Sequence, residues 1–118
     1  EPSPDNLSFI YFAVLFISYV FEQTISAIEF KTNNWKRAIK QVLSVSISFD
    51  YLEICVIEPK TLKSRNVIIK ACKEIGVGLY FFNQQQKMFN YVVMPEKVQK
   101  IWETQKKHVM DYIREVNK

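Results

Sequence analysis

The chain is poor in the residues that build metal clusters and flexible linkers. Its 118 residues include two cysteines, one histidine, two glycines and four prolines. No CxxC pair or cysteine–histidine cluster is present, so a zinc site is not expected. A Ser-His-Asp or Cys-His catalytic unit would have to use His108, which stands in a charged C-terminal segment and suits that role poorly. The scarcity of glycine and proline also argues against a long flexible linker.

Long apolar runs are scarce as well. The stretch FIYFAVLFISYVF, at 9–21, would reach only ~20 Å as a helix, against ~30 Å of hydrocarbon in a bilayer. We therefore expect no membrane span, and the stretch lacks the basic leader and cleavage site of a signal peptide. Cys55 and Cys72 fall in segments with a buried pattern, which favours reduced core thiols and a cytoplasmic location.

Apolar residues are nevertheless plentiful enough for one core. The hydrophobic fraction is 48%, the aromatic fraction is 14%, and the net charge is +4. These values argue against disorder, and the length suits one domain. The mild positive charge is compatible with a polyanionic partner without identifying one. We expect a single domain over 1–118, with a core at 9–93 and a C-terminal helix at 95–116.

Strand and helix patterns alternate along the chain. Two apolar strands that turn at Glu22-Gln23 should form a hairpin, and the first should be a long central strand. Asn33 or Asn34 can cap the following helix, and Gly76 suits a helix C-terminus. The expected strands are 9–21, 24–31, 51–57, 77–82 and an edge strand at 88–93, with helices after Asn34, at 61–75 and at 95–116. This order predicts an α/β fold with a mixed central sheet, an antiparallel hairpin followed by βαβαβ, flanked by helices.

Apolar stripes predict which side of each helix faces the core. The last helix should dock on the body or pair with a second subunit. The residues expected to face inward are Trp35, Ala38, Ile39, Val42 and Leu43, then Leu62, Val67 or Ile68, Ala71, Cys72 and Ile75, and finally Val98, Ile101, Trp102, Val109, Met110, Ile113 and Val116.

Glu29 and Lys31 are the residues best placed to carry chemistry. Strand alternation puts both on one face, about 7 Å apart along the strand. A carboxylate can bind a hard cation such as Mg²⁺, and the Phe30 carbonyl can complete part of the coordination. The neighbouring ammonium can polarise a water or offset charge that grows on a phosphate. With Gln41 on the next helix, this set suits cleavage of phosphodiesters by in-line attack of water.

The segment AIEFKTNNWKRAIKQVL, followed by YLEICVIEP and GVGLYFF, resembles the PD-(D/E)XK nuclease superfamily, which has the restriction-endonuclease-like fold. The resemblance covers roughly 9–83. It implies that Glu29 is a metal ligand, that Lys31 acts on the water and that Gln41 helps to position either one. It also implies Mg²⁺ or Mn²⁺ as cofactor and an endo- or exodeoxyribonuclease activity on DNA.

One departure from that superfamily concerns its aspartate on the neighbouring strand. In the expected hairpin Glu29 faces Phe16, which cannot bind a metal. Asp5 could serve only if residues 6–13 fold back or coil into a helix. Two alternatives therefore stay open. One is a nuclease-like fold that has lost its chemistry and acts as a nucleic-acid-binding or assembly module, and the other is an unrelated α/β domain with no nucleic-acid role. In the second case Glu29 and Lys31 would be ordinary solvated residues that pair across strands.

Polar and basic residues around the start of the first expected helix are candidates for phosphate contacts. Alternatively, the lysines and arginine form an ordinary solvated helix face. The candidate phosphate contacts are Asn33, Asn34, Lys36, Arg37 and Lys40.

A homodimer through the C-terminal helix or an apolar strand edge is a further expectation.

Overall fold

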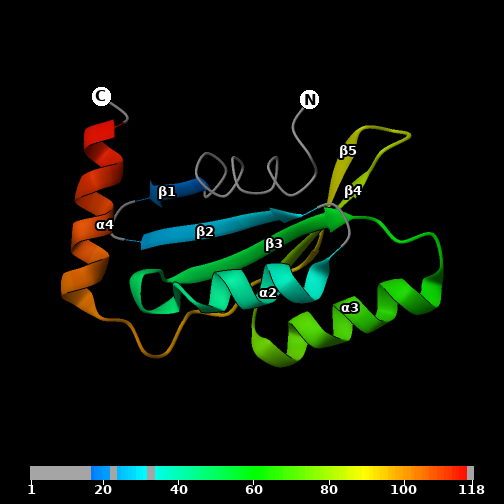
Figure 1. Ribbon diagram of the computed structural model, residues 1–118, viewed down its shortest axis with the longest axis horizontal. Coiled ribbons are helices and arrows are strands. Elements are labelled where there is room, and N and C mark those ends of the chain that lie inside the picture. Colours follow the sequence, from blue (N-terminus) through cyan, green and yellow to red (C-terminus); the bar gives the residue numbers. More distant parts are fainter. Residues whose placement is uncertain (1–16, 22–23, 32–33, 117–118) are drawn as a thin grey trace.

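The computed structural model describes residues 17–21, 24–31 and 34–116, which form an α/β arrangement around a mixed sheet (Figure 1). The predicted class is therefore confirmed at this level. In the described part the strands are β1 (Ile17–Phe21), β2 (Thr24–Lys31), β3 (Tyr51–Ile57), β4 (Gly78–Asn83) and β5 (Met88–Val93). The helices are α2 (Trp35–Leu43), the short 3-10 helix η1 (Ser46–Ser48), α3 (Leu62–Ile75) and α4 (Glu103–Val116).

The strands follow one another across the sheet in chain order. β1 is antiparallel to β2, β2 to β4 run parallel, and β5 returns antiparallel to β4. This is the predicted hairpin followed by βαβαβ, with the predicted edge strand at the end. Ile17 pairs with Ile28 and Phe21 with Thr24, which is the predicted hairpin register.

The prediction of a long central first strand is only partly met. Among the described strands β1 pairs with β2 alone and lies at the edge of the sheet, so its central position was predicted wrongly. The remainder of that predicted strand, 9–16, and the turn at 22–23 lie outside the described residues.

The core lies between one face of the sheet and helices α2 and α3, which Figure 1 shows along the same side. Both helices connect parallel strands that succeed one another in the sheet, and right-handed crossovers place such helices on a common face. β3 runs through the middle of the sheet and is buried along nearly its whole length, as its apolar sequence predicts. The core combines Ile25, Ala27, Ile54, Val56 and Leu79 of the sheet with Ala38, Ile39, Val42, Ile68 and Cys72 of the helices.

Helix ends match the local sequence closely. The Asn34 side chain caps α2 by accepting a hydrogen bond from the Arg37 amide at 3.1 Å. Thr61 caps α3 in the same way, accepting from the Ser64 amide at 3.2 Å. Gly76 ends α3 with φ of 85°, a left-handed conformation that glycine adopts without steric cost.

The predicted inward faces are too broad. Leu43, Leu62 and Ile75 are exposed, and Ala71 is half-buried. Of the two alternatives Val67 and Ile68, the structure buries Ile68. Helix α3 buries Ile68 and Cys72 and leaves Leu62, Val67 and Ile75 exposed, because only one narrow side of the helix reaches the sheet.

The C-terminal helix begins at Glu103, so the prediction of a helix from 95 is wrong. The backbone amides of the preceding segment bond to other parts of the chain. Glu96 donates to the Gly76 carbonyl at 2.9 Å, Val98 to Asp50 at 2.7 Å and Trp102 to Ile47 at 2.8 Å. In a helix from 95 the Trp102 amide would bond to the Val98 carbonyl, so its bond to Ile47 is incompatible with that helix, and the segment 95–102 is held as an irregular strap.

Helix α4 docks on the body, as one of the two predicted alternatives states. It contacts η1 and β1, at the end of the sheet where β2 and β3 begin (Figure 1). Met110 is buried in the core, with Val109 and Ile113 packed against it, whereas Trp102 is 58% exposed. None of the helices in the described ranges combines the length and the apolar character needed to cross a bilayer.

Candidate active site

Glu29 and Lys31 lie at the carboxyl end of β2, beside the carboxyl ends of the parallel strands β3 and β4. Their register partners on β3 are Ile54 and Val56, both of which belong to the core on the α2 and α3 side. The two side chains therefore share the face that these helices cover, as strand alternation predicts. In open α/β sheets this edge is the usual position of a ligand site.

The Glu29 carboxylate is buried and under-coordinated. The residue is 1% exposed, and the Lys31 Nζ atom lies 3.5 Å from Glu29 Oε1. That distance is long for a good hydrogen bond, and within the described residues neither carboxylate oxygen accepts one. Burial raises the pKa of Glu29, and the nearby Lys31 ammonium opposes that rise. The Lys31 ammonium is thus the only cationic side chain that the described residues place against the Glu29 carboxylate.

Gln41 contributes a second buried oxygen. It lies on α2, which packs against β2 and β3, about 9 Å along the helix axis from Trp35. Its Oε1 atom is buried and has no hydrogen-bond partner among the described residues. The described residues show no hydrogen bond between Gln41 and Glu29, and each side chain has a buried oxygen without a described partner.

Of the other predicted ligand and contact residues, the structure describes Phe30 and Asn34 but neither Asp5 nor Asn33. The Phe30 backbone lies between Glu29 and Lys31, and its ring packs edge-on to Phe89 with centroids 6.4 Å apart. Asp5 and Asn33 lie outside the described residues. The Asn34 side chain serves as the α2 cap.

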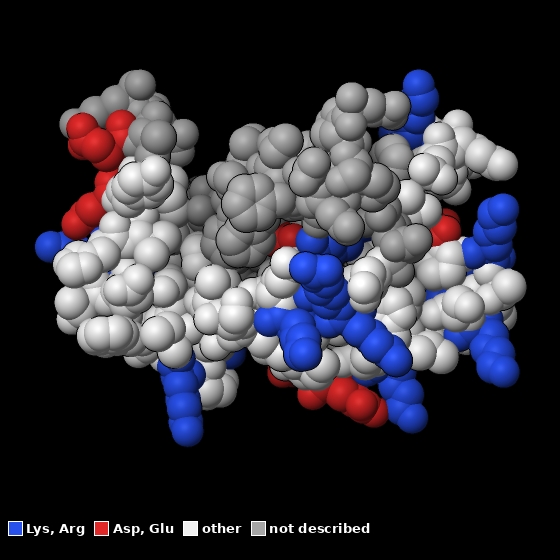
Figure 2. Space-filling model, viewed as in Figure 1, with Lys and Arg blue, Asp and Glu red and all other residues white. Residues whose placement is uncertain are grey.

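The predicted basic face of α2 is exposed. Lys36, Arg37 and Lys40 all reach solvent, and the Lys36 Nζ atom lies 5.6 Å from the centroid of the Trp35 ring. Figure 2 shows lysine and arginine side chains gathered over the side of the molecule where α2 and α3 lie. These residues form a solvent-exposed basic surface on α2.

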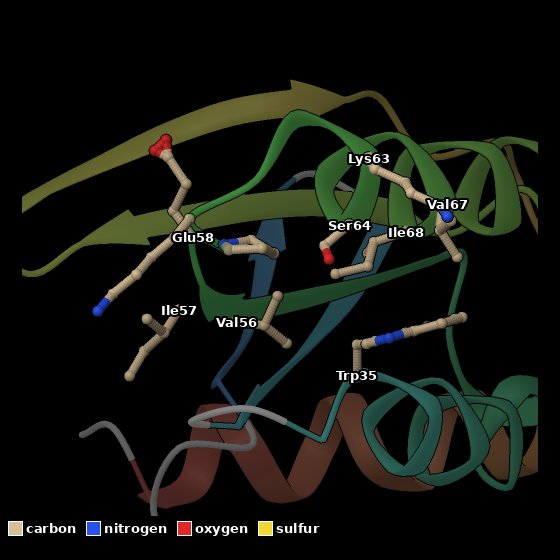
Figure 3. A pocket seen from close by; sticks show the side chains of 10 residues that line it. Trp35, Val56, Ile57, Glu58, Lys63, Ser64, Val67 and Ile68 are labelled. Carbon is tan, nitrogen blue, oxygen red and sulfur yellow. The ribbon is translucent and has the colours of Figure 1, made fainter.

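A cleft of about 620 Å³ opens beside the site. It lies between the start of α2, the end of β3 and the first turns of α3, and Figure 3 shows its lining side chains. Val56 lines it, and Val56 is the register partner of Lys31. The described residues that line the cleft include neither Glu29 nor Lys31, and its link to the site is Val56 on the neighbouring strand.

Two buried acids were not singled out by sequence reasoning. Glu53 is 2% exposed and projects from the opposite face of the sheet, where Tyr80 and Tyr91 stack with centroids 4.2 Å apart. Burial raises its pKa, and hydrogen bonds from Tyr91 and Tyr80 oppose the rise. Gly78 leaves room for it, since a Cβ there would meet Glu53 Cγ at 2.9 Å. The sequence signal for Glu53 was a single acidic residue within an otherwise apolar strand.

Asp50 is the second of these acids. It is fully buried, and its Oδ2 atom accepts a hydrogen bond from the Ile25 amide at 2.8 Å. Lys106 lies within 3.0 Å of the same carboxylate. These partners are structural, and they lie at the end of the sheet where β2 and β3 begin, away from Glu29.

The described residues contain no group of three or more histidine, cysteine, aspartate or glutamate side chains arranged to hold a metal ion. Among the described residues, the Glu29 carboxylate and the Gln41 amide oxygen are buried and have no hydrogen-bond partner, and both are oxygen donors of the kind that hard cations prefer. Comparisons with protein-family models, with curated proteins and with solved structures found no significant match to this chain.

Proposed function

We propose that this chain is a metal-dependent nuclease with a restriction-endonuclease-like fold, which hydrolyses phosphodiester bonds in DNA. The single observation that carries the proposal is the buried Glu29–Lys31 pair at the carboxyl end of β2, whose carboxylate oxygens have no hydrogen-bond partner among the described residues. An antiparallel hairpin, a helix bearing Gln41 and a parallel βαβ unit surround it in the order that the superfamily resemblance implies.

The donor set suits Mg²⁺ or Mn²⁺. Mg²⁺ prefers oxygen ligands, keeps several waters and commonly takes one or two carboxylates together with substrate phosphates. Glu29 and Gln41 would hold the ion, with the Phe30 carbonyl beside them. The bound ion supplies Lewis acidity and a water of lowered pKa.

Lys31 would act on the reacting groups. Its ammonium lies 3.5 Å from Glu29, on the side of the sheet that opens to the cleft. It would orient a water for attack on phosphorus and stabilise the negative charge on the phosphoryl oxygens as the bond to the leaving sugar oxygen breaks. The side chain is only 7% exposed, and this low exposure strengthens such an electrostatic contribution.

The exposed basic residues of α2 would contact the DNA backbone. Lys36, Arg37 and Lys40 would neutralise phosphates without reading sequence, so binding should weaken steeply with salt.

A second candidate is a nuclease-like module that binds nucleic acid without cutting it. The observation that favours it is the ion pair itself, because Lys31 already neutralises Glu29 at 3.5 Å in the way a purely structural pair would. The two candidates share the fold and the basic face, and they differ in whether Glu29 takes up a cation.

The deciding experiment measures cleavage of end-labelled single-stranded and duplex DNA with Mg²⁺, with Mn²⁺ and with EDTA. Glu29→Gln and Lys31→Met should each reduce metal-dependent cleavage by about 100-fold or more. Glu74→Gln and Lys73→Met, exposed changes on α3, are matched controls and should cut normally. Calorimetric titration with Mn²⁺ should show binding to the parent chain and none to Glu29→Gln.

Two results would decide against the nuclease. Unchanged cleavage in both site variants would assign any observed activity to a contaminant. Intact salt-sensitive DNA binding with no cation binding and no cleavage would favour the binding module.

A further inference from the structure

The cleft beside Lys31 combines features that a flat, negatively charged ligand would need. Its volume of about 620 Å³ falls within the range of about 300–1,000 Å³ typical of small-ligand sites. It opens at the carboxyl end of β3. Val56 lines it and is the register partner of Lys31 on β2. A group seated against Val56 would lie one strand away from Lys31.

One wall of the cleft is aromatic. Trp35 begins α2 and is half-buried, with its indole ring facing the space that Val56 and Ile68 also line (Figure 3). Packing against the core fixes the position of this tryptophan while part of the ring stays accessible. A half-buried indole over an apolar floor is a suitable platform for stacking a nucleobase.

The opposite side is polar and basic. Lys60 and Lys63 line the cleft together with the Ser64 hydroxyl, at the start of α3, whose first turn carries no acidic residue. Glu58 is the only acidic residue among the lining side chains, and Figure 3 shows its carboxylate directed away from the Trp35 ring. The charge around the stacking surface therefore favours an anion.

We propose that this cleft takes an unpaired nucleotide of a DNA strand, with the base stacked on Trp35 and the adjoining phosphate contacted by Lys60 and Lys63. The inference rests on the proposed nuclease function, since it names the form of DNA that enters the site. It goes further by assigning the cleft, which the Glu29–Lys31 chemistry does not use. Duplex DNA offers no splayed base to this pocket, so the preferred ligand is single-stranded.

Binding can be tested in EDTA, where cleavage is abolished, so that failure of this proposal is separable from failure of the nuclease. The probe is a fluorescent 12-nucleotide oligothymidylate, compared with a duplex of equal length by fluorescence anisotropy. We expect tighter binding of the single strand. Trp35→Ala should weaken that binding about 5- to 150-fold, whereas Trp35→Phe should retain most of it.

The chain has two tryptophans, which provides an internal control. Trp102 is 58% exposed and does not line the cleft, so Trp102→Phe should bind normally. In that variant Trp35 is the sole tryptophan, and its fluorescence should be quenched on adding the oligonucleotide. A melting curve verifies that Trp35→Ala remains folded, and Trp35→Phe keeps the test decisive if it does not.

The contribution of positive charge to oligonucleotide binding is tested with two substitutions on α3. Lys63→Glu should weaken binding and flatten its salt dependence by about 0.7 in the log–log slope. Lys73→Glu, the same change at the far end of α3, should have a smaller effect. Equal binding of duplex and single strand, absence of Trp35 quenching, or equal effects of Lys63→Glu and Lys73→Glu would each overturn the proposal.

Discussion

The ammonium of Lys106 lies 3.0 Å from both carboxylate oxygens of Asp50, although the two residues are separated by 56 positions in the sequence. Asp50 precedes β3 and Lys106 belongs to α4, so the pair joins the C-terminal helix to the sheet. The Asp50 carboxylate also binds the Ile25 amide at 2.8 Å, and the Asp50 carbonyl accepts from the Val98 amide at 2.7 Å. The buried residue Asp50 therefore links β2, the segment 95–102 and α4.

Loss of either partner should destabilise the protein strongly. Asp50→Asn or Lys106→Met leaves an uncompensated buried group, and we expect a loss of about 3–5 kcal/mol in unfolding free energy from urea denaturation. The double variant should lose less than the sum of the two single losses, because its second change removes a charge that the first has stranded.

Lys97 provides the control for that experiment. Its Nζ atom lies 4.0 Å from Asp50, but its side chain is 60% exposed. Lys97→Met should therefore change stability by no more than about 1 kcal/mol. Equal losses for Lys97→Met and Lys106→Met would contradict the view that burial decides the strength of this pair.

Glu53 should make stability depend on pH. Its folded pKa is raised above 4.5 by burial, so between 4.5 and the raised value the folded chain binds a proton that the unfolded chain has released. The contribution of this carboxyl to unfolding free energy is favourable below that window and is lost as pH rises through it. Glu53→Gln should remove the loss and be more stable than the parent at pH 7.

The measurement is urea denaturation of both proteins at a series of pH values from 4 to 8. The stability difference between Glu53→Gln and the parent should grow with rising pH. Glu74→Gln, an exposed change, should follow the parent at each pH. A difference that is flat, or that shrinks as pH rises, would show that Glu53 is not penalised by its burial.

Gly76 should resist substitution because of its backbone conformation. At φ of 85° a side chain costs about 1–2 kcal/mol, so Gly76→Ala should lower the unfolding free energy by that amount. Gly76→Asn should cost less, since asparagine tolerates the left-handed region better. Both variants meet the movable Glu96 carboxylate, which lies 2.9 Å from the added Cβ, so equal losses would point to crowding and not to the backbone.

Much of the fold could be predicted because it is encoded by neighbouring residues. Alternation at 24–31 predicted β2 with its bounds. An asparagine marked the start of α2, and Gly76 marked the end of α3. The pairing of Ile17 with Ile28 followed from the position of the turn alone. The shared face of Glu29 and Lys31 followed from the two-residue period of a strand.

Other features were predicted wrongly because distant contacts override local preference. Residues 95–102 have a helical pattern, but Gly76, Asp50 and Ile47 take three of their amides. Leu62 has the spacing of a core residue, yet α3 presents another side to the sheet and leaves it 66% exposed. The sequence carries no local sign of which side of a helix will find a partner.

By itself the sequence determined the order of strands and helices, the hairpin register and the strand end at which Glu29 and Lys31 meet, because each depends on spacing along a short stretch of chain. Only the tertiary structure decided that Glu29 is buried with no hydrogen-bond partner among the described residues, that Trp35 borders a cleft and that Asp50 meets Lys106. Burial, cavities and long-range ion pairs arise where separate segments pack together, and no local pattern contains the position of the other segment.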